Sequence, residues 1–365
     1  MIRALLALLL IVGHFPVAAA PRRRAVQHPS APIPPAAIVT AAREAAEAAL
    51  KAGAPAVQIA VSDGGQIVYS AAFGMSDRES ATAATPRSVL QTGSITKQFT
   101  AAAILRLAER GALTLDDRIE KFVPELNPRG ATITLRHLLS HTSGIRGLSP
   151  NQYAPLTREQ FIKLVDGQPL DFTPGSKWSY SNSGYRLLGY AIESITGSSF
   201  ADFVHREFAL PLGLLDTGVC GTSNLPLPEG YGVPQGTWMR IPAVHMSVPF
   251  AAGALCSTAS DLARWSHLLA TGGVLLPASY ATMITPARLT NNTFAPYGLG
   301  LFLQNQLGRP AVWHTGGIPG FQSSLLYFPD HDIAIAVIVN ALPAPIGVDA
   351  HGIALTVAGA ALATP

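Results

Sequence analysis

The spacing of apolar and polar residues divides the chain into strand-rich outer parts and a helical central part. Residues 37–51 show the Ala-rich pattern of a helix. Residues 56–61 and 67–72 are typical of two strands joined by a turn around Asp63-Gly64-Gly65. From about residue 94 to about 285 the pattern is mainly helical, with helices expected at 134–140, 158–166, 185–195, 200–208 and 259–270. Strands are expected again at 297–302, 325–328 and 333–339, followed by a closing helix at 348–361.

These elements predict an α+β fold. We expect the first two strands and the late strands to share one antiparallel sheet, which the first and last helices flank. The sheet lobe would comprise residues of about 37–87 and 295–365, and an inserted all-helical lobe would comprise about 88–294. A cleft is expected at the seam between the two lobes.

The first 36 residues are predicted to lie outside this fold. Residues 1–20 resemble a secretory signal peptide, with a basic Arg3, an apolar stretch at 4–12 and small residues at Val17-Ala18-Ala19. An uncleaved anchor is the alternative, although the apolar stretch is short for a bilayer span. Residues 21–36 are rich in proline and predicted to be a disordered tether. We therefore expect a periplasmic or secreted protein.

Composition narrows the class of protein further. Of 365 residues, 48% are hydrophobic and only 13% are charged, so the chain can bury a large core. The formal net charge is +3 and the basic residues are scattered, which argues against nucleic-acid binding. The two cysteines, Cys220 and Cys256, would reach an oxidising compartment after export, where a disulfide is possible. Two separate buried thiols are the alternative.

Candidate chemistry begins at Ser94-Ile95-Thr96-Lys97, the only place where a lysine follows a serine at three residues. A helical pattern follows at once, so Ser94 and Lys97 are expected on one helix face, where the amine can reach the hydroxyl. A desolvated amine can remove the proton that keeps a serine hydroxyl a weak nucleophile. A helix start also supplies free N–H groups for a developing oxyanion. Taken alone, this spacing is also typical of an ordinary helix N-cap.

Two further clusters change that interpretation. Tyr180-Ser181-Asn182 is the only Tyr-x-Asn of the chain and precedes a helical segment. His314-Thr315-Gly316-Gly317 follows an apolar segment at 310–313. Each has an ordinary alternative, a helix cap for Asn182 and a hairpin turn for the glycine pair. Their joint occurrence after the Ser-x-x-Lys, in this order, is far more specific than any one of them.

With these three motifs the sequence resembles the serine β-lactamase and penicillin-binding protein superfamily. The Tyr-x-Asn form is similar to the branch of class C β-lactamases, D-Ala-D-Ala carboxypeptidases and family VIII esterases. The resemblance extends from about Ala37 to the end and includes the stretches 135–144 and 257–262. It implies the β-lactamase/transpeptidase-like fold. His314 stands where class C β-lactamases typically carry lysine, which argues against strong β-lactamase activity.

The resemblance implies catalytic roles for Ser94, Lys97 and Tyr180. Ser94 would attack an acyl carbon and Lys97 would accept or relay its proton. Tyr180 would act as general base or complete the relay. Ionising a phenol of pKa ~10 at pH ~7 costs about 4 kcal/mol. One cation at ~4 Å in an effective dielectric of ~20 supplies about that much, so the charge of Lys97 alone could hold Tyr180 ionised.

The remaining motif positions would bind the substrate. These are, as the resemblance implies, Asn182, His314, Thr315 and Gly316. Asn182 would bond both Lys97 and a substrate amide, while His314 and Thr315 would face a substrate carboxylate. The backbone N–H groups of Ser94 and Gly317 would form the oxyanion hole. Because histidine is charged only below roughly pH 6.5, we expect His314 to titrate and to make the rate pH-dependent.

Other catalytic patterns are missing from the sequence. There is no Gly-x-Ser-x-Gly elbow, no His-Glu-x-x-His and no glycine-rich phosphate loop followed by lysine. His137 and His141 are four residues apart but lack the glutamate of a zinc protease, so both are interpreted as structural.

The sequence therefore predicts an exported serine hydrolase that works through an acyl-enzyme without metal or cofactor. D-Ala-D-Ala-type peptides or related amides and esters are the expected substrates, and a β-lactam would be a slow substrate or an inhibitor. A carboxylesterase of the same fold and a non-turnover penicillin-binding or sensing module are the alternatives. The expected partners are a small-molecule or peptide substrate, with no nucleic acid and no stable membrane span.

Overall fold

The computed structural model of this protein describes residues 35–222 and 225–363. The predicted signal peptide at 1–20 and all but the last two residues of the predicted tether at 21–36 lie outside this part of the chain. Among the described residues, no helix is both long enough and apolar enough to cross a membrane.

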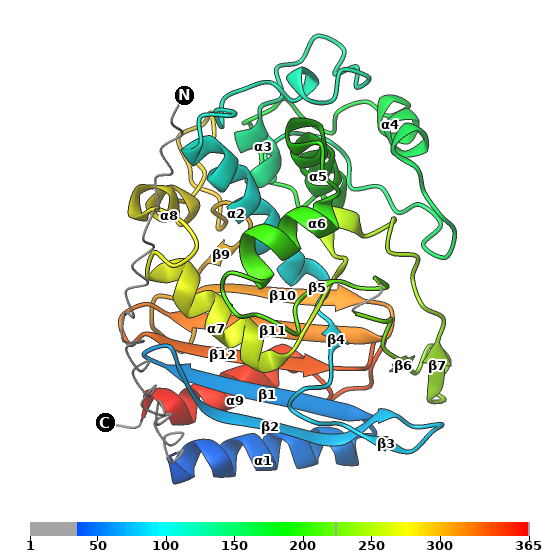
Figure 1. The fold of residues 1–365 in the computed structure, drawn as a ribbon, viewed down its shortest axis with the longest axis vertical. Coiled ribbons are helices and arrows are strands. Elements are labelled where there is room, and N and C mark those ends of the chain that lie inside the picture. The colour runs from blue at the N-terminus through cyan, green and yellow to red at the C-terminus, as the bar shows by residue number, and fades with distance from the viewer. Residues whose placement is uncertain (1–34, 223–224, 364–365) are drawn as a thin grey trace, which may run out of the picture. The chain divides into compact units, whose positions relative to one another are not determined.

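A seven-stranded antiparallel sheet organises the described part of the chain (Figure 1). The strand order is β3-β2-β1-β12-β11-β10-β9. The strands are β1 (Ala56–Asp63), β2 (Gln66–Asp77), β3 (Thr82–Ala83), β9 (Phe302–Leu303), β10 (Val312–Ile318), β11 (Phe321–Phe328) and β12 (Ile333–Val339). Strand β1 pairs with β12 from Val57↔Val339 to Asp63↔Ile333, so the first and last parts of the fold share the centre of the sheet.

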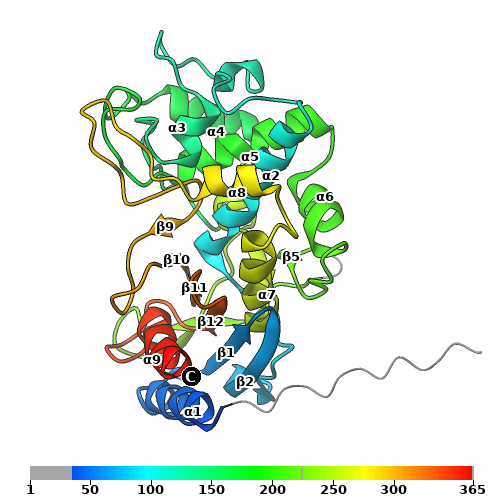
Figure 2. The ribbon, with the colours of Figure 1, turned by 90° about the vertical axis from the view of Figure 1, so that its left-hand side faces the viewer.

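Helices cover both faces of this sheet. Helices α1 (Ala36–Lys51) and α9 (Ala350–Leu362) pack side by side on one face, and α7 (Ala259–Ala270) packs on the other (Figure 2). Every residue of β12 is buried, because alternate side chains point to opposite faces and both faces are covered. Ile335 belongs to the core beneath α1 and α9, whereas Ala336 belongs to the core on the other side.

The segment between β3 and β9 is largely helical, and Figure 1 shows most of it beyond the β10 edge of the sheet. Its helices, besides α7, are α2 (Thr96–Glu109), α3 (Leu135–Leu139), α4 (Arg158–Asp166), α5 (Asn182–Thr196), α6 (Phe200–Val204) and α8 (Pro277–Met283). Small strands complete it: β4 (Leu90–Gln91), β5 (Gly218–Val219), β6 (Gly230–Gly232), β7 (Met239–Ile241) and β8 (Leu255–Ser257). Helix α2 is buried on nearly all sides, so the side chains at its start lie inside the protein.

Most predicted elements are present, but β10, α8 and the small strands β4 to β8 were not expected, and β11 begins four residues before the expected strand at 325–328. Two expected elements also differ in their bounds. Where a strand was expected at 297–302, only the short strand β9 (Phe302–Leu303) forms, because Gly300 has φ +82° and packs against the start of α2. A Cβ atom at Gly300 would lie 2.7 Å from the carbonyl oxygen of Lys97. The helix expected at 200–208 ends as α6 and continues as a wider turn, in which Leu210 N–H bonds the His205 carbonyl.

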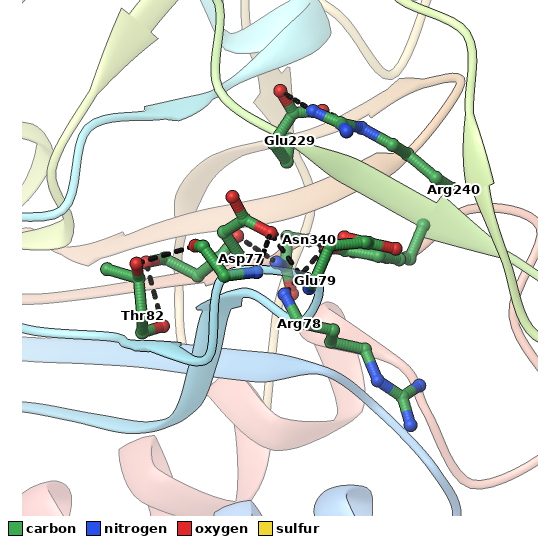
Figure 3. A network of polar contacts seen from close by, with 10 residues as sticks. Asp77, Arg78, Glu79, Thr82, Glu229, Arg240 and Asn340 are labelled. Carbon is green, nitrogen blue, oxygen red and sulfur yellow. Dashed lines mark hydrogen bonds and ion pairs between the residues drawn. The ribbon is translucent and has the colours of Figure 1, made fainter.

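A polar network fixes the hairpin of β6 and β7 to the edge of the sheet (Figure 3). The phenol oxygen of Tyr231, on β6, accepts from Arg78 N–H at 2.8 Å and its hydroxyl donates to Glu79. Asn340, just after β12, accepts from Ala56 N–H at 2.8 Å. The bonds of Tyr231, together with the one from its N–H to the carbonyl oxygen of Asn340 at 3.1 Å, hold the hairpin in a defined position.

Candidate active site

The nucleophile candidate lies on a tight turn before α2. Gly93, Ser94 and Ile95 form one turn of 3₁₀ helix, with Gly93 at φ +53°. A Cβ atom at Gly93 would lie 2.9 Å from the backbone nitrogen of Gly317, so this turn approaches β10 as only glycine allows. Ser94 is partly exposed whereas both of its neighbours are buried. The turn thus presents one hydroxyl to solvent above a packed core.

The amine of Lys97 lies beneath this hydroxyl and is completely buried. Its Nζ lies 3.1 Å from Ser94 Oγ, 2.8 Å from Asn182 Oδ1 and 2.8 Å from the carbonyl oxygen of Ala252. Burial lowers the pKa of Lys97 well below its usual value. A neutral amine has two N–H groups for the two carbonyl-type oxygens and one lone pair, which the Ser94 hydroxyl can reach. The site therefore suits a lysine that accepts the serine proton.

Tyr180 lies beside the same two groups. The centroid of its ring lies 4.7 Å from Lys97 Nζ, and its phenol is hydrogen-bonded to Ser94. Burial raises the pKa of Tyr180 far above its usual value, and the bond to Ser94 offsets this only in part. The expectation that Lys97 holds Tyr180 ionised is therefore wrong for the free protein. The burial that disfavours the phenolate of Tyr180 also disfavours the ammonium of Lys97 that would stabilise it.

His314 also differs from the expectation. It is 2% exposed; its Nε2 lies 2.9 Å from the hydroxyl of Tyr297, and its Nδ1 lies 2.6 Å from the carbonyl oxygen of Thr315. Burial lowers the pKa of His314 to about 3. The expected titration near pH 6.5 is thus wrong, because the imidazole is neutral at ordinary pH and bonded within the protein.

The pleat of β10 explains this placement. Successive residues of a strand point to opposite faces, and along β10 His314, Gly316 and Ile318 are buried while Thr315 and Gly317 are more exposed. A Cβ atom at Gly316 would overlap the carbonyl oxygen of Thr92. Gly316 was expected to contact substrate, but the structure places it on the buried face, where it allows β10 to pack against the nucleophile turn.

Ser94, Asn182 and Gly317 line one pocket with a volume of about 170 Å³. Ser94 and Gly317, whose backbone N–H groups are the expected oxyanion hole, thus lie on the same pocket. The other lining residues come mainly from two loops and include Leu148, Gln152, Val244, Val248 and Ile318. A second, mainly apolar cavity of about 530 Å³ shares Gln152, Gly317, Ile318 and Pro319 with the first and extends along the hairpin of β6 and β7.

Two further residues of this region, Tyr297 and Arg186, are not among the site residues expected from the sequence. Tyr297 is buried and donates its hydroxyl hydrogen to His314, yet in the sequence it was only part of an expected strand. Arg186 lines the pocket one helical turn after Asn182. The spacing of four residues from Asn182 was the available signal, because it places both side chains on one face of α5.

The two histidines interpreted as structural have clear packing roles. His137 caps α3, where its Nδ1 accepts from Thr134 N–H at 3.3 Å. His141 accepts from Ser181 N–H at 3.1 Å, and its ring centroid lies 4.3 Å from that of Tyr180. Burial lowers the pKa of His141 well below its usual value. His141 thus fixes the Tyr180–Ser181 segment as a neutral ring.

Cys220 and Cys256 are joined by a disulfide in the structure. Cys256 lies on β8, opposite Gln91 of β4, and β4 leads into the nucleophile turn. The bond therefore braces the short sheet from which Ser94 emerges.

Comparison with known proteins adds three findings to this geometry. A family model described as Beta-lactamase matches residues 37–358. Penicillin-binding protein 4* of Bacillus subtilis (strain 168) is 28% identical over 77% of this chain and 67% of its own length. Protein flp of Staphylococcus aureus (strain N315) is 26% identical over 78% of this chain and 59% of its own length. The chain thus spans about two thirds or less of these relatives.

A solved structure has the same fold. A D-stereospecific amidohydrolase from a Streptomyces species superposes with a TM-score of 0.73 at 28% identity, over 86% of this chain and 96% of that one. The predicted β-lactamase/transpeptidase-like α+β fold and the predicted resemblance are both confirmed.

Proposed function

Because the chain belongs to the beta-lactamase family, we propose that it is a serine hydrolase that cleaves amide or ester bonds through an acyl-enzyme on Ser94. The observation that carries this proposal is the buried Lys97 amine, 3.1 Å from Ser94 Oγ. Its proposed substrates are peptides or amides of the D-Ala-D-Ala type. The likeness to a D-stereospecific amidohydrolase supports this choice.

Acylation begins with proton transfer from Ser94 to the neutral amine of Lys97. Ser94 Oγ then attacks the carbonyl carbon, and the N–H groups of Ser94 and Gly317 stabilise the oxyanion. As the C–N or C–O bond breaks, Tyr180 gives its phenol proton to the leaving group. The new charge on Lys97 stabilises the phenolate by about 4 kcal/mol at ~4 Å in an effective dielectric of ~20, and Lys97 then returns a proton to Tyr180.

Deacylation uses Lys97 and Ser94 in the reverse sense. Lys97 is again a neutral amine, so it can take a proton from water that attacks the acyl carbon. When the ester bond to Ser94 breaks, that proton passes from Lys97 to Ser94 Oγ. The cycle ends with a free carboxylic acid and an unchanged protein. Asn182, 2.8 Å from Lys97, is a positioning residue because it aligns the amine.

The decisive experiment compares wild type with Ser94→Ala. Wild type is expected to react covalently with fluorescent penicillin or a fluorophosphonate, and Ser94→Ala is expected to lose the labelling. Ser260→Ala is a matched control, because this serine lies at the start of α7 and bonds Ser70, away from the pocket. Undiminished labelling of Ser94→Ala would refute the proposal.

A panel of three substrates distinguishes the activities that this chemistry permits. It consists of a D-Ala-D-Ala peptide, a chromogenic cephalosporin and a short-chain p-nitrophenyl ester. Turnover of the peptide with slow cephalosporin turnover is the expected result. Labelling without turnover of any of the three would indicate a penicillin-binding or sensing module instead.

A carboxylesterase is the second candidate function. The apolar cavity of about 530 Å³ beside the pocket favours it, because this cavity can take an alkyl or aryl group of an ester. Fast turnover of the p-nitrophenyl ester with no release of D-alanine from the peptide would support this alternative.

We also propose that the protein is exported, as residues 1–20 and the disulfide between Cys220 and Cys256 suggest. The N-terminal sequence of protein recovered from the periplasm or medium tests this. A mature chain that begins close to Ala19 is expected, and an intact Met1 would contradict cleavage.

A further inference from the structure

The pocket that contains Ser94 is also lined by a buried cation, Arg186, which forms no ion pair with any residue that the structure describes. Arg186 is 3% exposed and lines this pocket. Within the described residues, its Nε and Nη1 atoms have no hydrogen-bond partner. Its Nη2 donates only to the hydroxyl of Tyr190, at 3.3 Å. Burial lowers the pKa of Arg186, and no carboxylate is among the groups that act on this pKa. An arginine nevertheless stays protonated in proteins, so the site holds a full positive charge.

Neighbouring rings fix the guanidinium in place. Its central carbon lies 4.1 Å from the ring centroid of Phe161, which is itself fully buried. This stacking and the bond to Tyr190 hold one edge of the group and leave Nε and Nη1 free. Nε–H and the N–H groups of Nη1 lie on different sides of the guanidinium, so each can donate a hydrogen bond to an anion, and a two-bond fork would also use the second N–H of Nη2. The group is therefore a fixed positive charge with free donors, which suits an anion.

The position of Arg186 indicates which part of the substrate it would meet. It lies one turn after Asn182, on the wall formed by α5. Tyr180, the proposed donor to the leaving group, and Thr315 are not part of this wall. The pocket therefore faces the acyl group that stays on Ser94 rather than the leaving group.

Packing alone is the competing explanation for Arg186. Burying a charge without a partner is unfavourable, and a hydrophobic residue of similar size would pack there without that penalty. Packing leaves unexplained that Nε and Nη1 of a residue that lines the pocket have no partner within the described residues.

We propose that Arg186 binds a carboxylate on the acyl part of the substrate and so gives the enzyme a preference for anionic acyl groups. The preference rests on the proposed hydrolase function, whereas the anion site itself can be tested without turnover.

A matched pair of esters tests the preference. Mono-p-nitrophenyl glutarate and p-nitrophenyl pentanoate carry acyl chains of equal carbon number, and only the first ends in a carboxylate. The quantity measured is the ratio of their kcat/KM values, which cancels any general loss of activity. Arg186→Met should lower this ratio by roughly tenfold to a hundredfold, and Arg186→Lys should lower it less because the charge remains.

Arg158→Gln is the matched control. Arg158 also approaches the Tyr190 ring, at 5.3 Å, but it is partly exposed and paired with Glu125 at 2.9 Å. Its loss should leave the ratio unchanged. An unchanged ratio in Arg186→Met would overturn the proposal, as would a similar fall in Arg158→Gln.

A binding measurement separates this inference from the hydrolase function. In the Ser94→Ala background, calorimetry compares glutarate with neutral pentanamide. Glutarate should bind more tightly, and adding Arg186→Met should remove that advantage. If wild type turns over neither ester but this result holds, the hydrolase proposal fails and the anion site stands. Equal affinities for both ligands, with and without Arg186, would refute the anion site even if turnover is fast.

Discussion

Replacement of His314 by glutamine should make the stability of the protein less sensitive to acid. In the native state burial holds the pKa of His314 at about 3, whereas an unfolded histidine titrates near ~6.5. Below pH ~6.5 the unfolded chain therefore binds a proton at this position that the native protein does not bind. Stability falls as the pH falls, from about 6.5 down to about 3, and is fully present above that window.

The size of the effect follows from these two pKa values. Each unit of difference corresponds to about 1.4 kcal/mol. At pH ~5.0 the unfolded histidine is almost fully protonated and the native one is not, so His314 alone should cost about 2 kcal/mol relative to pH ~7.5. This is a large share of a typical stability of about 5–15 kcal/mol.

Urea unfolding at pH 7.5 and 5.0 measures the effect in wild type and His314→Gln. The variant will be less stable at both pH values, because the partners Tyr297 and Thr315 lose their bonds, but its loss between the two pH values should be smaller by about 2 kcal/mol. His351→Gln is a control, because this ring is only half-buried and stacks on Trp313 at 4.9 Å. Its removal should change the acid sensitivity less. Equal losses in wild type and His314→Gln would refute the account of a neutral, buried imidazole.

Three further predictions concern the catalytic groups and the disulfide. First, kcat/KM for a neutral ester should rise with pH as Lys97 loses its proton. Lys97→Arg should abolish this rise and most of the activity. A pH profile that is unchanged in Lys97→Arg would contradict the role of the amine. Second, Gly316→Ala should unfold at a clearly lower temperature than wild type, because its Cβ would overlap a backbone carbonyl. Gly317→Ala should have an unfolding temperature close to that of wild type, because its Cβ would lie 3.4 Å from Leu342. Third, the intact mass of unreduced protein should be two hydrogens below that of the reduced chain. Replacing both cysteines by serine should lower the free energy of unfolding by roughly 4 kcal/mol, because the disulfide closes a loop with a sequence separation of 36. Rapid alkylation of both thiols without reduction would exclude the bond.

The sequence by itself determined the family and the α+β fold, because both depend on patterns that are local in the chain. Ser94 and Lys97 are three residues apart at a helix start, and this spacing alone brings hydroxyl and amine to one face. The strand-like segment at 333–339 was recognisable from its continuous apolar run, which is typical of a strand buried on both faces. The roles of the individual motif residues in catalysis remain predictions.

The sequence did not determine which groups carry charge. A pKa depends on burial and on neighbours, and those neighbours come from distant parts of the chain. His314 is neutral because the pleat of β10 turns it toward Tyr297 inside the protein, and partial burial of Tyr180 raises the pKa of its phenol. A motif consists of residue types and their spacing, and neither predicts how far a side chain is buried or what its pKa will be.

Only the tertiary structure brought Arg186 into the pocket as an unpaired charge. In the sequence it is one arginine in an amphipathic helix, and nothing nearby indicates whether a carboxylate will pair with it. The fold packs Phe161 and Tyr190 around the guanidinium, and no acidic side chain of the described residues pairs with it. Local spacing thus determined which residues share a helix face, whereas long-range packing decided what surrounds each of them, because the free energy of a charge is set by the whole environment that folding builds around it.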